Sequence, residues 1–451
     1  MPARSIRAVS SPRRVSVDAC PGALRLHAAA DGPLARVRLP GGRLTGDQVR
    51  VLRELSHEWG DGHVELTSRG NMQVRALTGV STERLAGRLA DAGLLPAPSH
   101  ELVRNIAASP LPGGALDVAP LVGELDRALC ADPVLAGLPG RFLFALDSGR
   151  GDVAFPADVA AYPLGDGVAI LFAGVDAGLR VPAWRVVPTL LTAAHAFLSE
   201  RETPCTAPRT NPATSEILEA GGPAGGRWAP RSDGATVDRP DVPGARGAWR
   251  VRELVGGPGR LAALTAAALG VPLVAPVALE QPAVEAPVGL IAGPDGLVSV
   301  GAVVPLGRWN AVHMTVLERA ATLVVTPWRG VVVPGLAPEA ALTWGQAMAG
   351  VGLEIEQGSA WAGVTTCAGL PGCAKSLADV RADASRVVRA TDPGGGLPVH
   401  WVGCARGCGS PGGPHVRVEA TGRDYEVRSP AGSGRASVDG VAGLVAAARR
   451  S

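Results

Sequence analysis

Two widely separated segments of the chain show the same pattern of apolar and polar positions. Residues 31–77 read DGPLARVRLPGGRLTGDQVRVLRELSHEWGDGHVELTSRGNMQVRAL, and residues 295–336 read DGLVSVGAVVPLGRWNAVHMTVLERAATLVVTPWRGVVVPGL. Each segment has an alternating apolar run, then a helical stretch, then a run rich in β-branched residues. The pattern therefore predicts a strand, a helix and a strand in both places.

The two segments also share landmark residues. Asp31-Gly32 matches Asp295-Gly296, Pro40-x-Gly42-Arg43 matches Pro305-x-Gly307-Arg308, and Thr67 matches Thr326. Two distant copies of one unit indicate a duplicated, pseudo-twofold protein, because a solenoid would need several adjacent copies.

A longer mixed segment follows each copy. In the first, ALDVAPLVGELDRALCAD (115–132) predicts a helix and GRFLFALDS (140–148) contains a predicted strand. Between the two halves, residues 203–249 are rich in Pro, Gly and Arg and predict a long loop or linker. The alanine-rich run at 261–270 predicts a helix. A chain of 451 residues is too long for one ordinary core, so we expect several domains.

Composition limits the classes of function. The net charge is +2 and aromatic residues make up 4% of the chain, which argues against a nucleic-acid partner. No run reaches the roughly eighteen apolar residues of a membrane span. The basic N-terminus MPARSIRAVSSPRRVS lacks the apolar segment of a secretory signal. Together with an odd number of cysteines, these features predict a cytoplasmic protein without a membrane partner.

Four of the seven cysteines form two close pairs near the end of the chain. Cys367-x5-Cys373 lies in TTCAGLPGC, and Cys404-x3-Cys408 lies in GCARGCG. Four thiolates on two short glycine-rich loops can hold a 4Fe–4S cluster. A structural zinc ion is the alternative, although zinc sites usually have closer spacing at both ends. The scattered cysteines are interpreted as core or loop residues: Cys20, Cys130 and Cys205.

These motifs resemble those of the sulfite and nitrite reductase superfamily. The cysteine spacing matches, and LTSRGNMQVRAL (66–77) resembles the tetrapyrrole-contacting strand of that superfamily. VRNIAASPLPG (103–113) and LPGRF (138–142) resemble its second and third anion-binding segments. The resemblance covers most of the chain and implies an α+β fold, a duplicated pseudo-twofold architecture with two ferredoxin-like half-domains and two larger mixed α/β domains.

With this architecture we predict five regions. They are a first ferredoxin-like half-domain at 15–97, a first reductase-like α/β domain at 98–202, a Pro/Gly-rich linker or loop at 203–250, a helix plus the second ferredoxin-like half-domain at 251–340, and a second reductase-like domain carrying the 4Fe–4S cluster at 341–451.

The resemblance also implies which residues contact a tetrapyrrole. Sirohaem reductases gather several basic residues over the iron, and Arg69, Arg104 and Arg141 match three of those places. A fourth place, a lysine in the reductases, is Leu143 here. Its loss weakens the case for sulfite or nitrite as substrate, because charge-assisted contacts hold such anions. Further substrate-binding candidates, each with an ordinary surface or turn role as the alternative, are Asn71, Gln73, Arg75, Asn105 and Arg329.

Within the superfamily, three segments resemble the precorrin-3B synthase family of aerobic cobalamin synthesis. They are ACPGALRLHAAADGPLARVRLPGG (19–42), VTPWRGVVVPGL (325–336) and VGCARGCGSP (402–411). The resemblance implies an oxidoreductase of the monooxygenase type. Precorrin-3A would be hydroxylated at C20 with dioxygen, and its ring-A acetate would close a γ-lactone at C1 to give precorrin-3B.

The same resemblance implies cofactors and partners. A mononuclear non-haem iron is expected beside the cluster, since ground-state dioxygen reacts poorly with closed-shell molecules. No ligand triad stands out among the eight histidines, so neither iron ligands nor catalytic residues are assigned. The GxGxxA match at 257–262 follows no predicted strand. NADH is therefore expected to deliver electrons through a separate reductase or ferredoxin.

Two expectations concern the second cysteine pair. In the reductases the last cysteine also bridges to the sirohaem iron, so Cys408 is expected to face the substrate cavity. His400 and His415 flank this pair and are the histidines that we expect near the cluster, each in a structural role. Two alternatives stay open for the whole chain: a sirohaem-dependent sulfite or nitrite reductase, and a non-catalytic iron–sulfur or tetrapyrrole-binding protein.

Overall fold

The first helix of each repeated segment begins with the same kind of capping residues. The Thr45 hydroxyl accepts a hydrogen bond from the Gln48 amide, and the Gln48 side chain accepts one from the Thr45 amide, which closes a capping box at the start of α1 (Gly46–Trp59). Asn310 and His313 form the same reciprocal pair at α6 (Ala311–Leu317). The predicted strand, helix and strand are present in both copies.

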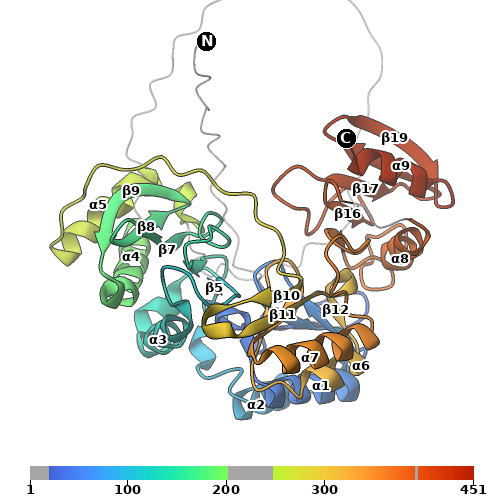
Figure 1. Cartoon of the computed structure of the whole chain (residues 1–451), viewed down its shortest axis with the longest axis horizontal. Coiled ribbons are helices and arrows are strands. Elements are labelled where there is room, and N and C mark those ends of the chain that lie inside the picture. Colours follow the sequence, from blue (N-terminus) through green and yellow to red (C-terminus); the bar gives the residue numbers. More distant parts are fainter. Residues whose placement is uncertain (1–19, 202–246, 392–394, 451) are drawn as a thin grey trace, which may run out of the picture.

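The computed structural model describes residues 20–201, 247–391 and 395–450 (Figure 1). Most of the predicted linker, and Cys205 with it, lies outside these residues. The first copy has β1 (Ala35–Val37), β2 (Arg43–Leu44), β3 (Val64–Leu66), β4 (Met72–Val74) and α2 (Thr82–Asp91). The second copy has β10 (Gly289–Ala292), β11 (Val298–Val303), β12 (Arg308–Trp309), β13 (Leu323–Val325), β14 (Gly330–Leu336) and α7 (Pro338–Gly350).

The two copies exchange their shortest strands. β2 of the first copy pairs antiparallel with β13 of the second, and β12 of the second pairs antiparallel with β3 of the first. The two sheets therefore have the orders β1-β4-β3-β12 and β10-β11-β14-β13-β2. The crossing is close: at Gly42, whose φ is 68°, a Cβ atom would lie 2.0 Å from the Val325 carbonyl oxygen. Only glycine fits there.

Because of this exchange, both copies share one hydrophobic core. Leu52 and Leu55 of α1 and Met314 and Leu317 of α6 are fully buried in the same cluster. The four helices α1, α2, α6 and α7 lie together along the lower side of the molecule in Figure 1. The half-domains are thus one packed unit.

The longer segments form a second pair of matching sheets, on either side of the half-domains (Figure 1). In both sheets the first two pairings are parallel and the last two antiparallel. The first has β5 (Ile106–Ala108), β6 (Phe144–Leu146), β7 (Val159–Leu164), β8 (Gly167–Phe172) and β9 (Val175–Val181), with α3 (Val118–Ala131), α4 (Val186–Arg201) and α5 (Gly257–Leu269). The second has β15 (Val364–Thr366), β16 (Val399–Val402), β17 (Val416–Ala420), β18 (Asp424–Ser429) and β19 (Gly432–Ser437), with α8 (Val380–Ala390) and α9 (Val441–Arg449).

Three local predictions are confirmed by these elements. The helix predicted within 115–132 is α3, the strand predicted within 140–148 is β6, and the alanine-rich helix is α5. The matching order of the two longer sheets shows that the duplication includes the longer segments that follow each copy, as the resemblance to the reductases implied. Short 3-10 helices lie at Pro40–Gly42, Pro98–His100, Pro133–Gly137, Ala183–Arg185, Val251–Glu253, Pro294–Gly296 and Pro305–Gly307.

Among the described residues, no helix has both the length and the apolar character that crossing a membrane requires.

The strand exchange can be tested at Trp309, which lies on β12 and is fully buried in the shared core. We expect Trp309→Ala to lower the free energy of unfolding by about 3–5 kcal/mol, because it removes a large aromatic side chain and leaves a cavity. Trp184→Ala, at a side chain that is 76% exposed, is the matched control and should change it little. Urea unfolding followed by far-ultraviolet circular dichroism measures the unfolding free energy of both variants. Small and equal changes in the two variants would contradict the shared core.

Candidate functional site

A row of polar side chains crosses the four-stranded sheet of the first copy. Arg36 on β1 lies opposite Gln73 on β4, Gln73 lies opposite Glu65 on β3, and Glu65 lies opposite Arg308 on β12. Arg36 Nη2 donates to Gln73 Oε1 at 2.6 Å, and Gln73 Nε2 donates to Glu65 Oε2 at 3.5 Å. Residues on either side of this row, such as Val37 and Met72, point into the core. One face of the sheet therefore carries a row of polar side chains.

The second copy does not repeat this row. At the matching positions the strands carry Val324, Val332 and Gly301, and only Arg43 on the exchanged strand is polar. A Cβ atom on Gly301 would lie 2.1 Å from the Pro287 carbonyl oxygen, so the chain passes directly over this position. The duplicated scaffold therefore offers a polar sheet face in its first copy only.

Four arginines gather beside the polar row: Arg36, Arg38, Arg69 and Arg250. Arg38 is 3% exposed. Among the described residues only its Nη1 has a hydrogen-bond acceptor, the Pro21 carbonyl oxygen, while Nε and Nη2 are buried without a partner there. Burial, and then the charge of Arg36, lowers the pKa of Arg38 to about 10. Burial, and then the charge of Arg250, lowers the pKa of Arg69 to about 10.

The carboxylates near these arginines already have hydrogen-bond or ion-pair partners. Glu101 accepts hydrogen bonds from the amides of Ala23 and Leu24 at 2.6 and 2.8 Å. Asp158 is paired with Arg250 at 2.7 Å. Buried cations with unpaired N–H groups are costly unless an anion joins them. This arginine cluster therefore fits a ligand that brings several carboxylates.

Arg69 is displayed by a tight turn that both copies share. In the first copy, the Asn71 amide donates to the Thr67 hydroxyl at 3.1 Å; in the second, the Gly330 amide donates to the Thr326 hydroxyl at 3.1 Å. Where the first copy has Gly70 in the left-handed region, the second has Arg329, with a φ of 58°. A non-glycine residue in that conformation is strained and often marks a functional place.

The other two predicted arginines, Arg104 and Arg141, have different partners in the structure. Arg104 is 3% exposed, and its Nε and Nη2 both donate to the Asp126 carboxylate at 2.7 Å. Arg141 is exposed and stacks over Trp249, with its guanidinium carbon 5.3 Å from the ring centroid. Leu143 is 6% exposed and lies in a hydrophobic cluster. Of the three arginines that the resemblance implied, Arg69 is the one that lies in the arginine cluster.

Asn71 and Asn105 connect two domains. Asn71 Oδ1 accepts from the Leu39 amide at 2.8 Å, and Asn71 Nδ2 donates to Asn105 Oδ1 at 3.4 Å. Asn105 Nδ2 donates to the carbonyl oxygens of Leu102 and Gly140 at 3.0 Å. Both side-chain amides are buried and hydrogen-bonded through oxygen and nitrogen, so they hold the turn after β1 and the 138–142 loop in place around the arginine cluster.

Arg75 reaches the other candidate centre, the cysteine loops. Its Nε and Nη2 donate to the Asp31 carboxylate at 3.1 and 3.0 Å, and Nη2 also donates to the Gly372 carbonyl oxygen at 3.0 Å. Gly372 lies between Cys367 and Cys373. Glu65 is within ion-pair distance of Arg75 at 3.7 Å and of Arg381 on α8. A continuous set of polar contacts thus joins the polar row to the first cysteine loop.

The four cysteines lie where β15 and β16 end. Cys367 directly follows β15, Cys404 follows β16 by two residues, and these strands are parallel neighbours. The Gly403 amide donates to Cys367 Sγ at 3.2 Å, and the Leu377 amide donates to the Gly403 carbonyl at 2.8 Å. A Cβ atom on Gly403 would lie 1.8 Å from Ser376 Oγ, so the two cysteine loops touch.

The four cysteines are free thiols on two adjoining loops. None of the four cysteines forms a disulfide. In the described residues, no three His, Cys, Asp or Glu side chains are close enough together to bind one metal ion. Thiolates on one zinc ion, at about 2.3 Å each, would have to be that close. In a 4Fe–4S cluster each thiolate binds a different iron atom, so the sulfur atoms lie farther apart.

The first copy has the same loops without cysteines. Ser109 follows β5 as Cys367 follows β15, and the Ser148 amide donates to Ser109 Oγ at 2.9 Å, as Gly403 donates to Cys367. Ser109 Oγ donates to Asp152 Oδ1 at 2.6 Å. Asp147 accepts hydrogen bonds from four backbone amides of the same loop. The cysteine set therefore belongs to one copy, as the polar row does to the other.

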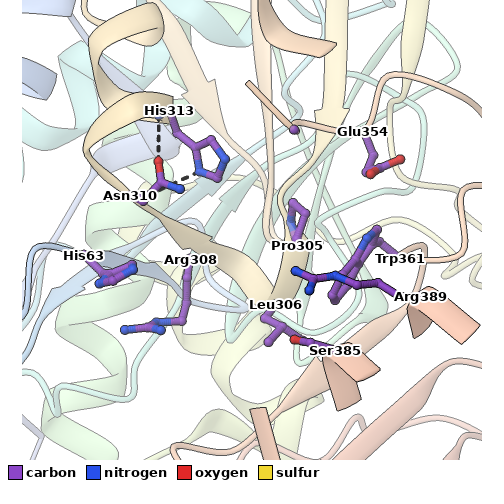
Figure 2. A pocket seen from close by; sticks show the side chains of 11 residues that line it. His63, Pro305, Leu306, Arg308, Asn310, His313, Glu354, Trp361, Ser385 and Arg389 are labelled. Carbon is purple, nitrogen blue, oxygen red and sulfur yellow. Dashed lines mark hydrogen bonds between the residues drawn. The ribbon is translucent and has the colours of Figure 1, made fainter. Parts of the chain in front are cut away.

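A pocket of about 420 Å³ lies where the half-domains meet the second longer domain, which carries the four cysteines and is called the cysteine domain below (Figure 2). His63, His313 and Glu354 line it and would be the residue types of a mononuclear iron triad. Figure 2 shows that they point to separate parts of the pocket. His313 is held by Asn310, and Glu354 accepts a hydrogen bond from Ser359 Oγ at 2.9 Å. The described residues do not fit a mononuclear iron there.

Comparison with solved structures supports the fold. The NirA protein of Mycobacterium tuberculosis matches with a TM-score of 0.63 over 91% of this chain and 79% of its own, at 18% identity. Residues 27–92 match the model of the nitrite/sulfite reductase ferredoxin-like half domain. The chain thus has the duplicated nitrite/sulfite reductase fold, and the predicted α+β fold class is confirmed.

Sequence relatives narrow the resemblance. A precorrin-3B synthase from Sinorhizobium sp. is 26% identical over 420 residues, which are 89% of this chain and 80% of that protein. A ferredoxin–nitrite reductase of Synechococcus elongatus is 26% identical over 420 residues, 84% and 74% of the two chains. One from Leptolyngbya laminosa is 31% identical over 169 residues, 33% and 32% of the two chains. The predicted resemblance to precorrin-3B synthase and its superfamily is confirmed, and these relatives are oxidoreductases.

No sequence motif pointed to Arg36, Arg38 or Arg250 as candidate site residues. Arg36 and Arg38 alternate with core residues on an amphipathic strand, a signal that was available but looked like ordinary strand polarity. Arg250 lies far along the chain and reaches the cluster only through its pairing with Asp158. No local pattern indicates that contact.

Removal of a buried cation should act in opposite directions at Arg38 and Arg104. We expect Arg38→Met to raise the free energy of unfolding of the ligand-free protein by about 1–2 kcal/mol, because it removes a buried charge that has no anionic partner. Arg104→Met should lower it by about 3–5 kcal/mol, because it leaves the Asp126 carboxylate unpaired. Urea unfolding measures both variants; a large loss of stability in Arg38→Met would show that its guanidinium is satisfied without a ligand.

Asp152 should make stability depend on pH. Burial chiefly, and the charge of Asp147, raise the pKa of Asp152 from its ordinary 3.8 to about 6. The folded protein then keeps a proton that the unfolded chain has released, so the contribution of this group is full below pH 3.8 and is lost as pH rises through about 6. In the wild type, the free energy of unfolding should therefore fall by on the order of 2 kcal/mol between about pH 4 and pH 6, and Asp152→Asn should remove this fall.

The control for this prediction is Asp166→Asn, at an exposed turn between β7 and β8. Its unfolding free energy should follow the wild-type pH dependence. If Asp152→Asn also followed the wild-type curve from pH 4 to 7, the Ser109–Asp152 pair would not hold a proton.

Proposed function

We propose that this protein is an oxidoreductase that hydroxylates precorrin-3A at C20 with dioxygen and closes the ring-A acetate to a γ-lactone at C1, giving precorrin-3B. The observation that carries the proposal is the arginine cluster of Arg36, Arg38, Arg69 and Arg250, with the unpaired buried N–H groups of Arg38 at its centre. A precorrin is a flat ring with many acetate and propionate groups, and guanidinium groups bind carboxylates with paired hydrogen bonds.

The substrate would lie with its carboxylates on the arginine cluster and beside the polar row. A guanidinium keeps the carboxylate that it binds ionised and holds it in one orientation. For lactone formation the ring-A acetate has to be an ionised carboxylate directed at C1, so an arginine contact would prepare it for closure. Leu143 presents an apolar buried side chain where the reductases have a lysine.

The cysteine loops would hold a 4Fe–4S cluster through Cys367, Cys373, Cys404 and Cys408. When bound, this cluster supplies single electrons. One oxygen atom of dioxygen enters the substrate and the other leaves as water, so each turnover needs two electrons, with NADH as their ultimate source. A mononuclear iron remains a prediction from the resemblance; we assign no step to it, since the described residues form no ligand set for it.

A separate reductase or ferredoxin would bring the electrons. This proposal follows from the absence of a nicotinamide-binding pattern in the sequence. A 3-10 helix at Val251–Glu253, and not a strand, lies directly before the start of α5 at Gly257, which agrees with that interpretation. Purified protein that oxidises NADH without any added protein or flavin would contradict it.

The second candidate is a sirohaem-dependent nitrite or sulfite reductase. Two observations favour it: the two ferredoxin–nitrite reductases among the sequence relatives, and Arg250. The Asp158 carboxylate accepts from the Leu143 amide at 2.9 Å and pairs with Arg250 at 2.7 Å. Arg250 thus provides a cation near the place where the lysine is missing, so Leu143 alone does not remove positive charge from this part of the site.

The deciding experiment uses anaerobically purified full-length protein. We expect iron and acid-labile sulfide, a broad iron–sulfur absorption and no sirohaem bands. With precorrin-3A, dioxygen and reductant, the product mass should rise by one oxygen atom. Strong sirohaem bands together with nitrite or sulfite reduction by reduced viologen would establish the alternative. Zinc without iron would contradict both enzyme proposals.

Substrate binding by the arginine cluster gives a direct prediction. Arg69→Gln should weaken precorrin-3A binding by about 10–100-fold, since one charge-assisted contact to a carboxylate contributes roughly 1.5–3 kcal/mol. Arg50→Gln, on the exposed face of α1, is the matched control and should bind as the wild type does. Absorbance titration under anaerobic conditions measures the dissociation constants. Equal affinities for both variants would exclude Arg69 from the site.

A further inference from the structure

Thr365 and His400 form a buried polar pair next to the cysteine loops. They lie directly opposite each other on the parallel strands β15 and β16, and His400 is fully buried. Thr365 Oγ1 and His400 Nδ1 are 2.8 Å apart, and His400 Nε2 is 3.0 Å from the carbonyl oxygen of Cys408. A carbonyl only accepts, so Nε2 must carry the proton and donate it. Nδ1 then accepts the Thr365 hydroxyl, which fixes the neutral tautomer.

The duplication provides an internal comparison. In the sheet of the first copy, the two positions that match Thr365 and His400 are Ala107 and Ala145, which also lie opposite each other. That copy has Ser109 at the position of Cys367 and Gly149 at the position of Cys404, so it has no cysteine loop that needs such a hydrogen bond. The polar pair occurs in the copy that carries the cysteines.

The Cys404–Cys408 loop needs anchoring, because little packs on it. Cys408 and Gly409 are exposed. Arg417 Nη2 donates to the Ala405 carbonyl oxygen at 2.9 Å, which holds the first part of the loop. The bond from His400 holds the end of the loop at Cys408 itself. A Cβ atom on Gly409 would lie 3.4 Å from His400 Cε1 and 3.7 Å from Arg329 Nη2, so this part of the loop is set between His400 and the strained turn of the second copy.

We propose that His400 is a positioning residue that fixes the Cys408 thiolate through the Cys408 carbonyl, with Thr365 holding the imidazole in the donating tautomer. The inference rests on the proposed 4Fe–4S cluster and deepens it. An exposed cysteine on a glycine-rich turn can adopt several orientations, and the hydrogen bond from a buried, immobile ring selects one. Outer hydrogen-bonding partners of this kind orient the ligands of metal centres.

The test compares three changes at this pair in the anaerobically purified full chain. His400→Leu keeps the approximate volume but removes the donor, His400→Gln keeps an N–H donor on a side chain of similar reach, and Thr365→Val removes the hydroxyl with little change in shape. The matched control is His415→Leu, whose ring contacts the Gly413 carbonyl at 2.8 Å and not a cysteine.

Three readouts other than turnover are used: iron and sulfide content, the electron paramagnetic resonance spectrum of the reduced protein, and the rate at which the cluster bleaches in air. We expect His400→Leu to bleach about tenfold faster than the wild type and to show a shifted spectrum, since one hydrogen bond of roughly 1.4 kcal/mol is lost. Thr365→Val should change the bleaching rate and the spectrum in the same direction as His400→Leu, but by a smaller amount. His400→Gln should restore the wild-type values, and His415→Leu should not differ from them.

The outcomes separate the two proposals. If the wild type binds a cluster and His400→Leu and Thr365→Val both match it in spectrum and bleaching rate, the role of His400 is wrong while the cluster stands. Should His400→Leu fail to fold by circular dichroism, Thr365→Val and His400→Gln decide by the same readouts. Wild-type protein without iron and sulfide would overturn the cluster and this inference together.

Discussion

The exchange of two short strands is the constraint on which the rest of this structure depends. Because β2 pairs with β13 and β12 with β3, the two half-domains share one core and cannot move independently. The exchange also places Arg308, from the second copy, directly opposite Glu65 of the first. The polar sheet face is therefore built from both halves of the chain, and the cysteine domain meets it through Arg381 and Arg75.

A symmetric scaffold has become chemically asymmetric. The polar row occurs on the first half-domain, whereas the matching positions of the second carry valines and a glycine under Pro287. The cysteines and the Thr365–His400 pair occur on the second longer domain, whereas the first has Ser109 at the position of Cys367 and alanines at the positions of the pair. The proposed flat substrate and the proposed cluster would each need only one such site, and the contact between Arg75 and Gly372 connects the two places.

Buried arginines in this protein differ by whether a carboxylate is present. Arg104 and Arg75 are held bidentately by Asp126 and Asp31, so they stabilise the fold as it stands. Arg38 is equally buried, yet two of its nitrogen atoms have no acceptor in the part of the chain that the structure describes. A charge buried without a partner is unfavourable. An anionic ligand would complete it, and this separates Arg38 from the arginines that a carboxylate already neutralises, Arg250 among them.

The sequence alone determined the repeated strand–helix–strand unit, the helices α3 and α5, and the placement of two cysteines on each of two loops. These features depend on local periodicity, capping and spacing. Its resemblance to the reductases indicated Arg69. It could not show that Arg104 is neutralised by Asp126, that Arg36, Arg38 and Arg250 converge, or that Ala107 and Ala145 mirror Thr365 and His400. Those facts depend on strand register and on contacts between residues far apart in the chain, which only the tertiary structure sets.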